Sequence, residues 1–252
     1  MIFGEKKRYY IERRIGDGLS RTGLKTTAAY LDFVESHAAE REALINAFTI
    51  NETYFFREEH QFAALARDIL PQTIRQKRPG DLVRIWSMPC STGEEPYSIA
   101  IWLLENWPLV DAYNVEIVGS DIDTAAIAKA TEGHYSERAL ARLPEAVKKS
   151  YFETSRHHKR QIIQDLRESV RFTQANIIDP ATIAALGKFD VILCRNLLIY
   201  FDDASRSRAA ENIYDSLVPG GFVCLGHSES MGRISDKFTL TRLPDAIVYR
   251  KL

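Results

Sequence analysis

The chain has 252 residues, which is long enough for one large domain and a small appendage. Its 45% apolar and 27% charged residues are ordinary for a globular protein and exclude wholesale disorder. The net charge is −1, so the molecule as a whole shows no bias toward nucleic acids or membrane surfaces.

Residues 1–70 are predicted to be helical, because apolar residues such as Tyr30, Phe33 and Val34 recur at helical spacing. The region starts abruptly, without a capping residue, and we expect it to be one helix short. Its first 25 residues carry an excess of basic side chains, which suits either an acidic partner or a solvated helix face. These side chains are Lys6, Lys7, Arg8, Arg13, Arg14, Arg21 and Lys25.

Beyond the turn signal Pro79-Gly80, strand-like runs alternate with helical ones. Leu82–Ser87 is the first predicted strand, and a helix starts near Glu94 with Pro96 in its first turn. Val115–Ser120 is the second, followed by an alanine-rich helix at 124–131. Later strands are expected at 170–174, 189–194, 222–226 and 246–250, with a helix at about 203–217.

This alternation predicts an α/β protein with a mostly parallel sheet covered on both faces. Ligands of such sheets bind outside the carboxyl ends of the strands. The loops after residues 87, 120, 175 and 194 are therefore expected to face one site.

The three cysteines are widely spaced and form no C-x-x-C pair, which argues against a disulfide framework and a zinc site. No apolar run approaches the ~18–20 residues that span a bilayer. The N-terminus also lacks the apolar stretch of a signal peptide, so we expect a cytoplasmic protein without membrane insertion.

The loop after the first strand, Ser91-Thr92-Gly93-Glu94-Glu95-Pro96, has one glycine and two adjacent acids. A dinucleotide site requires G-x-G-x-x-G, and acids there would repel a pyrophosphate. S-adenosylmethionine carries a sulfonium and an ammonium, which carboxylates attract. The loop therefore favours this cofactor over NAD, with Glu95 as a ligand. Glu94 is either a ligand or a favourable charge at the helix N-terminus.

Asp121 ends the second strand, where folds of this kind hold ribose hydroxyls with an acidic side chain. Asp123 is the competing candidate, and its alternative role is to cap the following helix. The position at the strand end favours Asp121.

Long motifs follow one another along the chain: NETYFFRE at 51–58, SMPCSTGEEPYSIA at 87–100, SDID at 120–123, CRNLLIYFD at 194–202 and GHSE at 226–229. Together they resemble the CheR-type chemotaxis receptor methyltransferases, which carry N-x-T-x-F-F-R-E, S-D-I-D, C-R-N-x-x-I-Y-F-D and G-H-S-E. The motifs cover nearly the whole chain in the same order, so chance agreement is a poor explanation.

The resemblance implies a class I (Rossmann-like) methyltransferase domain, a small helical N-terminal domain and an inserted small antiparallel β subdomain. We place the helical domain at 1–62, with a linker to about 80. The methyltransferase domain follows at 81–252, with the insertion at about 150–170, where the pattern is least regular.

The implied activity is that of a protein-glutamate O-methyltransferase, with S-adenosylmethionine as cofactor, S-adenosylhomocysteine as product and no metal. The implied partner is the cytoplasmic domain of a methyl-accepting chemoreceptor, not a nucleic acid. By motif position, the cofactor contacts fall on Asn51, Thr53, Arg57, Glu95, Asp121, Asn176, Ile177, Asn196 and Leu197.

Methyl transfer to a carboxylate needs no general base, because glutamate (pKa ~4.3) is already ionised at neutral pH. The site must supply alignment and partial removal of water. The resemblance places Arg57 at the site, as the group that holds the incoming carboxylate, and Tyr200, as a hydroxyl near the transferred methyl. The alternatives are an ion pair of Arg57 with Glu58 or Glu94, and a packing role for Tyr200.

Other site chemistries fit less well. His157-His158 has no further ligand at metal-site spacing, so a solvated loop is favoured over a metal centre. Gly226-His227-Ser228-Glu229-Ser230 lacks the last glycine of a nucleophile elbow, which argues against a serine hydrolase. His227 and Glu229 are expected to order the loop under the active site.

Aromatic residues 54–56 beside the basic N-terminus could instead stack on a nucleic acid. The neutral net charge and the sequence CRNL at 194–197, in place of D/N-P-P-Y/F/W, weaken this alternative. A non-catalytic cofactor binder would be indicated by loss of Arg57, Asp121 or Asn196, and all are present.

Overall fold

The structure is a computed structural model that describes residues 8–154 and 159–252. Two features singled out in the sequence lie outside these ranges: the basic residues Lys6 and Lys7, and the pair His157-His158.

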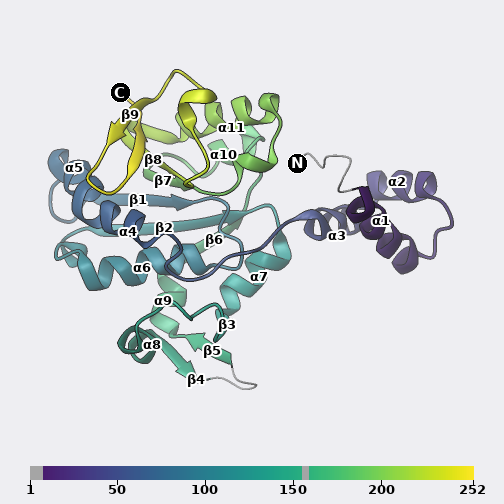
Figure 1. Ribbon diagram of the computed structural model, residues 1–252, viewed down its shortest axis with the longest axis horizontal. Coiled ribbons are helices and arrows are strands. Elements are labelled where there is room, and N and C mark those ends of the chain that lie inside the picture. The colour runs from purple at the N-terminus through teal and green to yellow at the C-terminus, as the bar shows by residue number, and fades with distance from the viewer. Residues whose placement is uncertain (1–7, 155–158) are drawn as a thin grey trace.

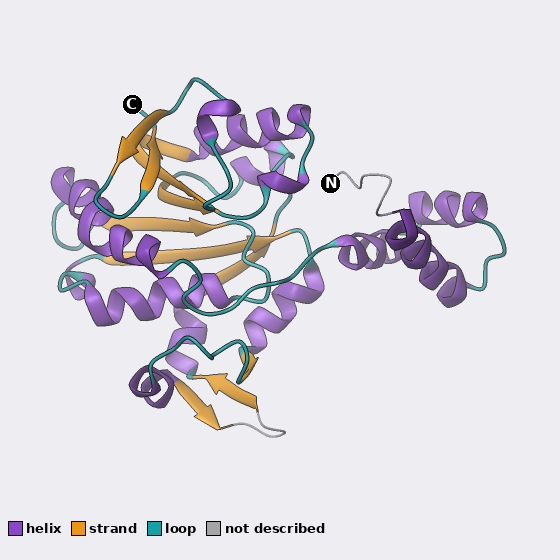
Figure 2. Cartoon of the chain, in the orientation of Figure 1, coloured by secondary structure: helices purple, strands orange, loops and turns teal. Residues whose placement is uncertain are grey.

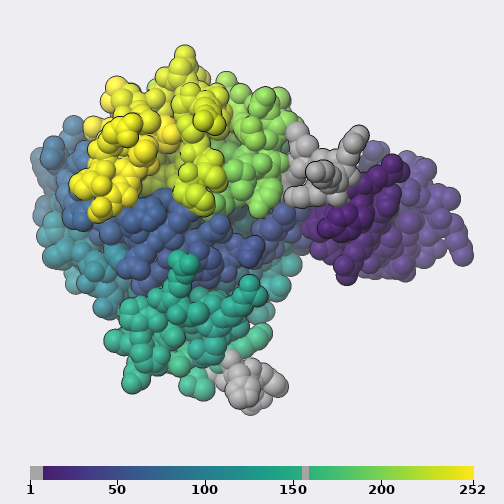
Figure 3. Space-filling model, in the orientation of Figure 1, coloured from purple at the N-terminus to yellow at the C-terminus, as the bar shows by residue number. Residues whose placement is uncertain are grey.

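Three helices form the N-terminal part, α1 (Arg8–Thr22), α2 (Thr27–Ser36) and α3 (Ala38–Phe48). Tyr30 is fully buried between them, and its hydroxyl donates a hydrogen bond to Glu40 at 2.7 Å. A Cβ atom on Gly18 would lie 2.2 Å from the Tyr30 hydroxyl, so the close approach of α1 requires glycine there. Figures 1 and 3 show these helices projecting from one side of the α/β body, with α3 nearest to it.

A seven-stranded sheet in the order β6-β2-β1-β7-β8-β10-β9 forms the centre of the body. β6, β2, β1, β7 and β8 are parallel neighbours, whereas β10 is antiparallel to both β8 and β9. The strands are β1 (Leu82–Ser87), β2 (Asn114–Asp121), β6 (Val170–Gln174), β7 (Phe189–Cys194), β8 (Leu217–Leu225), β9 (Thr239–Arg242) and β10 (Ile247–Arg250).

Helices cover both faces of this sheet, as its apolar strands require (Figure 2). Val83 and Ile85 of β1 pack into the core on one face, and Trp86 packs on the other, stacked on Phe189 with ring centroids 5.2 Å apart. The body helices are α4 (Glu59–Ala64), π-helix η2 (Leu65–Ile69), α5 (Leu70–Thr73), α6 (Glu94–Asn106), α7 (Thr124–Glu132), α9 (Gln164–Ser169), α10 (Pro180–Ala184) and α11 (Asp203–Ser216). Short 3₁₀ turns are η3 (Ile74–Gln76), η4 (Val110–Ala112), η5 (Leu198–Tyr200) and η6 (Met231–Arg233).

A small antiparallel sheet, in the order β3-β5-β4, projects below the body (Figures 1 and 3). It consists of β3 (His134–Ser136), β4 (Phe152–Thr154) and β5 (Lys159–Ile162), with α8 (Glu145–Tyr151) between β3 and β4. The sheet therefore starts at His134, earlier than the expected residue 150, and 170–174 belongs to the central sheet. The early strand was missed because β3 has only three residues and follows α7 directly at Gly133.

Other segments also differ from the expectation. Residues 49–58, within the region predicted to be helical, contain no helix. Residues between 62 and 80, assigned above to a linker, belong to the body and include the end of α4 and the helices η2 and α5, the last of which continues beyond residue 70. Their apolar side chains Leu65, Ile69 and Leu70 are buried in the same core as β1, which explains why the segment folds on the sheet. The edge strand β9 was missed because it is largely exposed and lacks an apolar face.

Candidate active site

Two neighbouring cavities open at the carboxyl ends of the parallel strands. The larger, about 400 Å³, is bounded by the loops after β1, β2, β6 and β7 and by the end of α3. The smaller, about 50 Å³, lies along residues 50–57 and shares Ile50, Pro89, Ser91 and Asn196 with the larger. The prediction that the loops after residues 87, 120, 175 and 194 face one site is confirmed.

Every residue proposed above for the cofactor or for catalysis lines one of these cavities. The larger cavity is lined by Asn51, Asp121, Asn176, Ile177, Asn196, Leu197 and Tyr200. The smaller cavity is lined by Thr53, Arg57, Glu95 and again Asn196. The structure brings these residues together, and their individual roles stay predictions.

The larger cavity also has an apolar wall from the N-terminal helices, made by Leu44, Ile45 and Phe48 of α3. Sequence reasoning missed this wall, because the helical spacing of these residues is also that of a helix packing within its own domain. The wall suits the apolar surface of a bound nucleoside.

Asp121 is held by the backbone around it. One carboxylate oxygen accepts from Ser91 N at 2.8 Å, and the other accepts from Asp123 N at 3.0 Å. Burial raises the pKa of Asp121 above its ordinary value. A carboxylate has about four acceptor sites, so this side chain can still accept hydrogen bonds from a ligand in the cavity.

Asp123 has a different place, outside the lining of both cavities. It caps α7 by accepting from Ala126 N at 3.0 Å, the capping role considered above. It also accepts from Asn51 Nδ2 at 2.7 Å, while Ser91 Oγ donates to Asn51 Oδ1 at 3.1 Å. Asp123 therefore fixes Asn51 at the edge of the larger cavity.

Glu95 belongs to a buried ion network that the sequence did not reveal. Its carboxylate accepts from Ser87 Oγ at 2.8 Å and from Arg195 Nη1 at 2.6 Å. Arg195 Nη2 lies 3.1 Å from Glu58 Oε2 and donates to the carbonyl oxygen of Arg57 at 2.6 Å. Burial raises the pKa of Glu95 although Arg195 opposes the shift.

The neighbouring Glu94 lines neither cavity. It lies in the first turn of α6 and accepts from Thr92 Oγ1 at 2.6 Å. The structure thus favours the helix-terminus interpretation of Glu94 over a ligand role.

Arg57 is presented by a turn in which Phe56 and Glu58 both have left-handed backbone angles, φ 56° and 59°. Arg195 stabilises this turn through the Arg57 carbonyl, and Ser98 Oγ does so by accepting from Phe56 N at 3.0 Å. Arg57 Nη1 donates to the carbonyl oxygen of Glu52 at 3.0 Å. In the described parts of the chain Arg57 forms no ion pair, so the pairing with Glu58 or Glu94 considered above does not occur.

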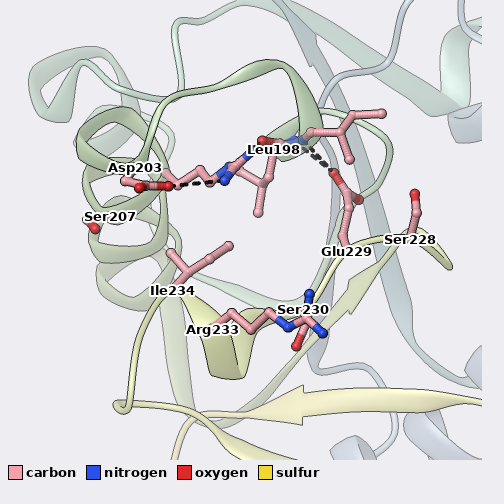
Figure 4. Close-up of a pocket in the computed structure, with 10 residues that line it drawn as sticks. Leu198, Asp203, Ser207, Ser228, Glu229, Ser230, Arg233 and Ile234 are labelled. Carbon is pink, nitrogen blue, oxygen red and sulfur yellow. Dashed lines mark hydrogen bonds and ion pairs between the residues drawn. The ribbon is translucent and has the colours of Figure 1, made fainter.

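Glu229 anchors the loop that carries Asn196, Leu197 and Tyr200. Its carboxylate accepts from the backbone N–H groups of Asn196 at 2.7 Å, Leu198 at 2.8 Å, Ile199 at 3.3 Å and Gly226 at 2.9 Å. Figure 4 shows Glu229 bonded to the loop at Leu198, on the wall of a separate cavity. The expected ordering role of Glu229 is confirmed.

The imidazole of His227 pairs with Glu58. Its Nδ1 lies 2.8 Å from Glu58 Oε1, so the imidazole extends the Arg195 network toward solvent. Glu58, placed between His227 and Arg195, has a lowered pKa even though burial acts in the opposite direction.

Comparisons with known proteins agree with this arrangement. The family model "CheR methyltransferase, SAM binding domain" matches residues 51–247, and "CheR methyltransferase, all-alpha domain" matches residues 1–49. Chemotaxis protein methyltransferase 2 of Vibrio cholerae is 46% identical over 100% of this chain and 88% of its own length. Chemotaxis protein methyltransferase 2 of Pseudomonas aeruginosa is 37% identical, covering 90% and 80%. The chemotaxis protein methyltransferase of Vibrio anguillarum is 34% identical, covering 99% and 91%.

Proposed function

The chain belongs to the CheR methyltransferase family, and from that premise we propose that it esterifies glutamate side chains of a chemoreceptor, thereby tuning chemosensory signalling. S-adenosylmethionine supplies the methyl group, carried on a sulfonium. The observation that carries this proposal is the junction of two cavities at Asn196: a large one with Asp121 and a small one with Arg57.

The residues of the larger cavity fit S-adenosylmethionine. Asp121 supplies acceptors for ribose hydroxyls, and Ile177 and Leu197 supply apolar surface for an adenine ring. Glu95, which lines the adjoining smaller cavity, supplies negative charge for the ammonium and sulfonium groups. The single glycine of the first loop offers no cradle for a pyrophosphate.

The smaller cavity suits the acceptor carboxylate. Arg57 forms no ion pair in the described ranges, and a guanidinium binds a carboxylate through paired donors. Because an acceptor glutamate is already ionised near pH 7, Arg57 has only to orient it, and orientation contributes up to ~7–11 kcal/mol to a displacement. Tyr200 lines the larger cavity and is only partly buried, which supports a role for its hydroxyl near the transferred methyl over a packing role in the core.

The proposed partner is the cytoplasmic domain of a methyl-accepting chemoreceptor, and the proposed location is the cytoplasm. These assignments rest on the family and on its relatives, which are chemotaxis protein methyltransferases. Among the residues that the structure describes, no helix is both long enough and apolar enough to cross a membrane.

The direct test incubates the purified protein with methyl-labelled S-adenosylmethionine and the chemoreceptors of the source organism. We expect label on receptor glutamates that is released by mild base, as an ester requires, with the modified residue identified by mass spectrometry. Base-stable label, or label on another residue type, would contradict the proposal.

The Arg57→Ala variant tests the acceptor role. We expect kcat/KM to fall at least ~100-fold with an unchanged circular dichroism spectrum, because the carboxylate loses its orientation. Arg57→Lys keeps the charge but not the paired donors and should retain part of the activity. Arg75→Ala removes an exposed arginine away from both cavities and is the matched control.

A further inference from the structure

Two arginines contact the ring of Tyr54 at the small cavity. The Cζ atom of Arg57 lies 5.8 Å from the ring centroid, and the Cζ atom of Arg142 lies 4.6 Å from it. Arg57 and Tyr54 line the cavity, whereas Arg142 does not line it and is exposed. A second guanidinium therefore lies next to the acceptor cavity, outside it.

Arg142 is held there by the fold of the insertion. It lies in the turn between β3 and α8. A backbone hydrogen bond from Phe55 N to Ala139 O, 3.1 Å long, joins this turn to the motif at residues 51–58. The Phe55 ring packs edge-on against Tyr135, at 4.8 Å, and against Phe152, at 5.3 Å, both from the small sheet. The insertion and the acceptor side of the active site thus form one packed unit.

The charge of Arg142 has no partner among the carboxylates of the described residues. Arg160 of the same insertion differs, because it lies 2.9 Å from Glu137 and 3.7 Å from Glu145. Glu52, close in sequence to Tyr54, is an exposed acidic residue on the cavity lining. Its backbone carbonyl oxygen accepts a hydrogen bond from Arg57. An exposed cation stacked on an aromatic ring and free of an acidic partner can bind an anion from another molecule.

We propose that Arg142 binds a second acidic side chain on the receptor segment that delivers the acceptor glutamate, and thereby contributes to acceptor specificity. This inference rests on the proposed function. Arg57 holds the carboxylate that is methylated, and Arg142 holds a neighbouring one that is not. Arg142 is thus a positioning residue, whose effect falls on acceptor binding and not on the chemical step.

The test compares Arg142→Gln with Arg160→Gln, which removes the same charge from the same insertion. With a receptor cytoplasmic fragment as acceptor, we expect Arg142→Gln to raise the acceptor KM roughly 3- to 10-fold. The kcat and the dissociation constant of S-adenosylhomocysteine should be unchanged. The acceptor KM of Arg142→Lys should lie between those of the unaltered enzyme and Arg142→Gln. The acceptor KM of Arg160→Gln should equal that of the unaltered enzyme.

A double-mutant cycle identifies the partner group. Acidic residues flanking the acceptor glutamate are replaced by glutamine one at a time, and one of these changes should raise KM for the unaltered enzyme but not further for Arg142→Gln. Three results would overturn this inference alone. The acceptor KM of Arg142→Gln could equal that of the unaltered enzyme, or Arg160→Gln could raise the acceptor KM by the same factor. The third is that the effects of Arg142→Gln and of the receptor substitutions on KM are additive at every flanking position. Absence of any transfer by the unaltered enzyme would overturn the proposed function and the inference with it.

Discussion

The guanidinium of Arg195 lies 2.6 Å from the carboxylate of Glu95, and both side chains border the small cavity. The same guanidinium reaches Glu58 at 3.1 Å and the carbonyl oxygen of Arg57. One buried cation therefore joins the start of α6, where the methyl donor is proposed to bind, to the turn that presents Arg57. Arg195 thus links the part of the site proposed to bind the methyl donor to the part proposed to bind the acceptor.

The first prediction concerns this cation. Arg195→Met should lower the free energy of unfolding by about 3–5 kcal/mol, because it leaves buried carboxylates without their counter-ion. Urea denaturation measures the change. Adding Glu58→Gln to Arg195→Met removes one uncompensated charge and should restore part of the loss. If Arg195→Met were as stable as the unaltered protein, the ion pairs of Arg195 would not contribute this stabilisation.

The second prediction concerns the anchor of the 195–201 loop. Glu229→Gln replaces one acceptor oxygen by an N–H₂ donor, which opposes the backbone N–H groups of Asn196 or Leu198. We expect weaker binding of S-adenosylhomocysteine and at least ~10-fold lower kcat/KM, because Asn196 and Tyr200 lose their fixed positions. Calorimetry and initial rates measure both. The control is Glu211→Gln on the exposed side of α11, and equal behaviour of the two variants would contradict the anchoring role.

The third prediction concerns the pH dependence of donor binding. Burial holds the pKa of Glu95 above its ordinary value in the free protein. A bound cation favours the ionised carboxylate, so binding expels a proton wherever Glu95 is protonated. Affinity for S-adenosylmethionine should therefore rise as the pH increases through the Glu95 pKa of the free protein, and level off above it.

Calorimetry from pH 5 to 7, in buffers of different ionisation enthalpy, measures this proton release. Glu95→Gln should flatten the profile. Glu94→Gln is the matched control: burial also raises the pKa of Glu94, but its side chain lines neither cavity, and the profile should remain. A flat profile in the unaltered protein would show that Glu95 does not face the cation.

The position of Asp121 was predictable because it ends a strand of the parallel part of the sheet. Asn176 and Asn196 were assigned from motif positions, and the structure places both just after such strands. The carboxyl ends of such strands meet at one edge whatever the details of packing. The parallel sheet, and the expectation that the loops after its strands face one site, were predictable in the same way, because they need only the order of strands and helices.

Contacts between distant segments were not predictable in this way. Arg195 and Glu95 are separated by 100 positions, and no local pattern marks their pairing. The apolar wall from Leu44 and Phe48 depends on how α3 meets the body, and the contact of Arg142 with Tyr54 depends on how the insertion packs. Short strands such as β3 also escape detection, because three residues give too little alternation.

The central claim is that S-adenosylmethionine and its demethylated product bind at the strand ends with Asp121 as a ligand, and calorimetric titration with S-adenosylhomocysteine tests it most directly. The account predicts one molecule bound per chain, with Asp121→Asn weakening the affinity about 10- to 100-fold through loss of charge-assisted hydrogen bonds. No heat of binding with the unaltered protein, together with uptake of NAD or ATP, would contradict the account.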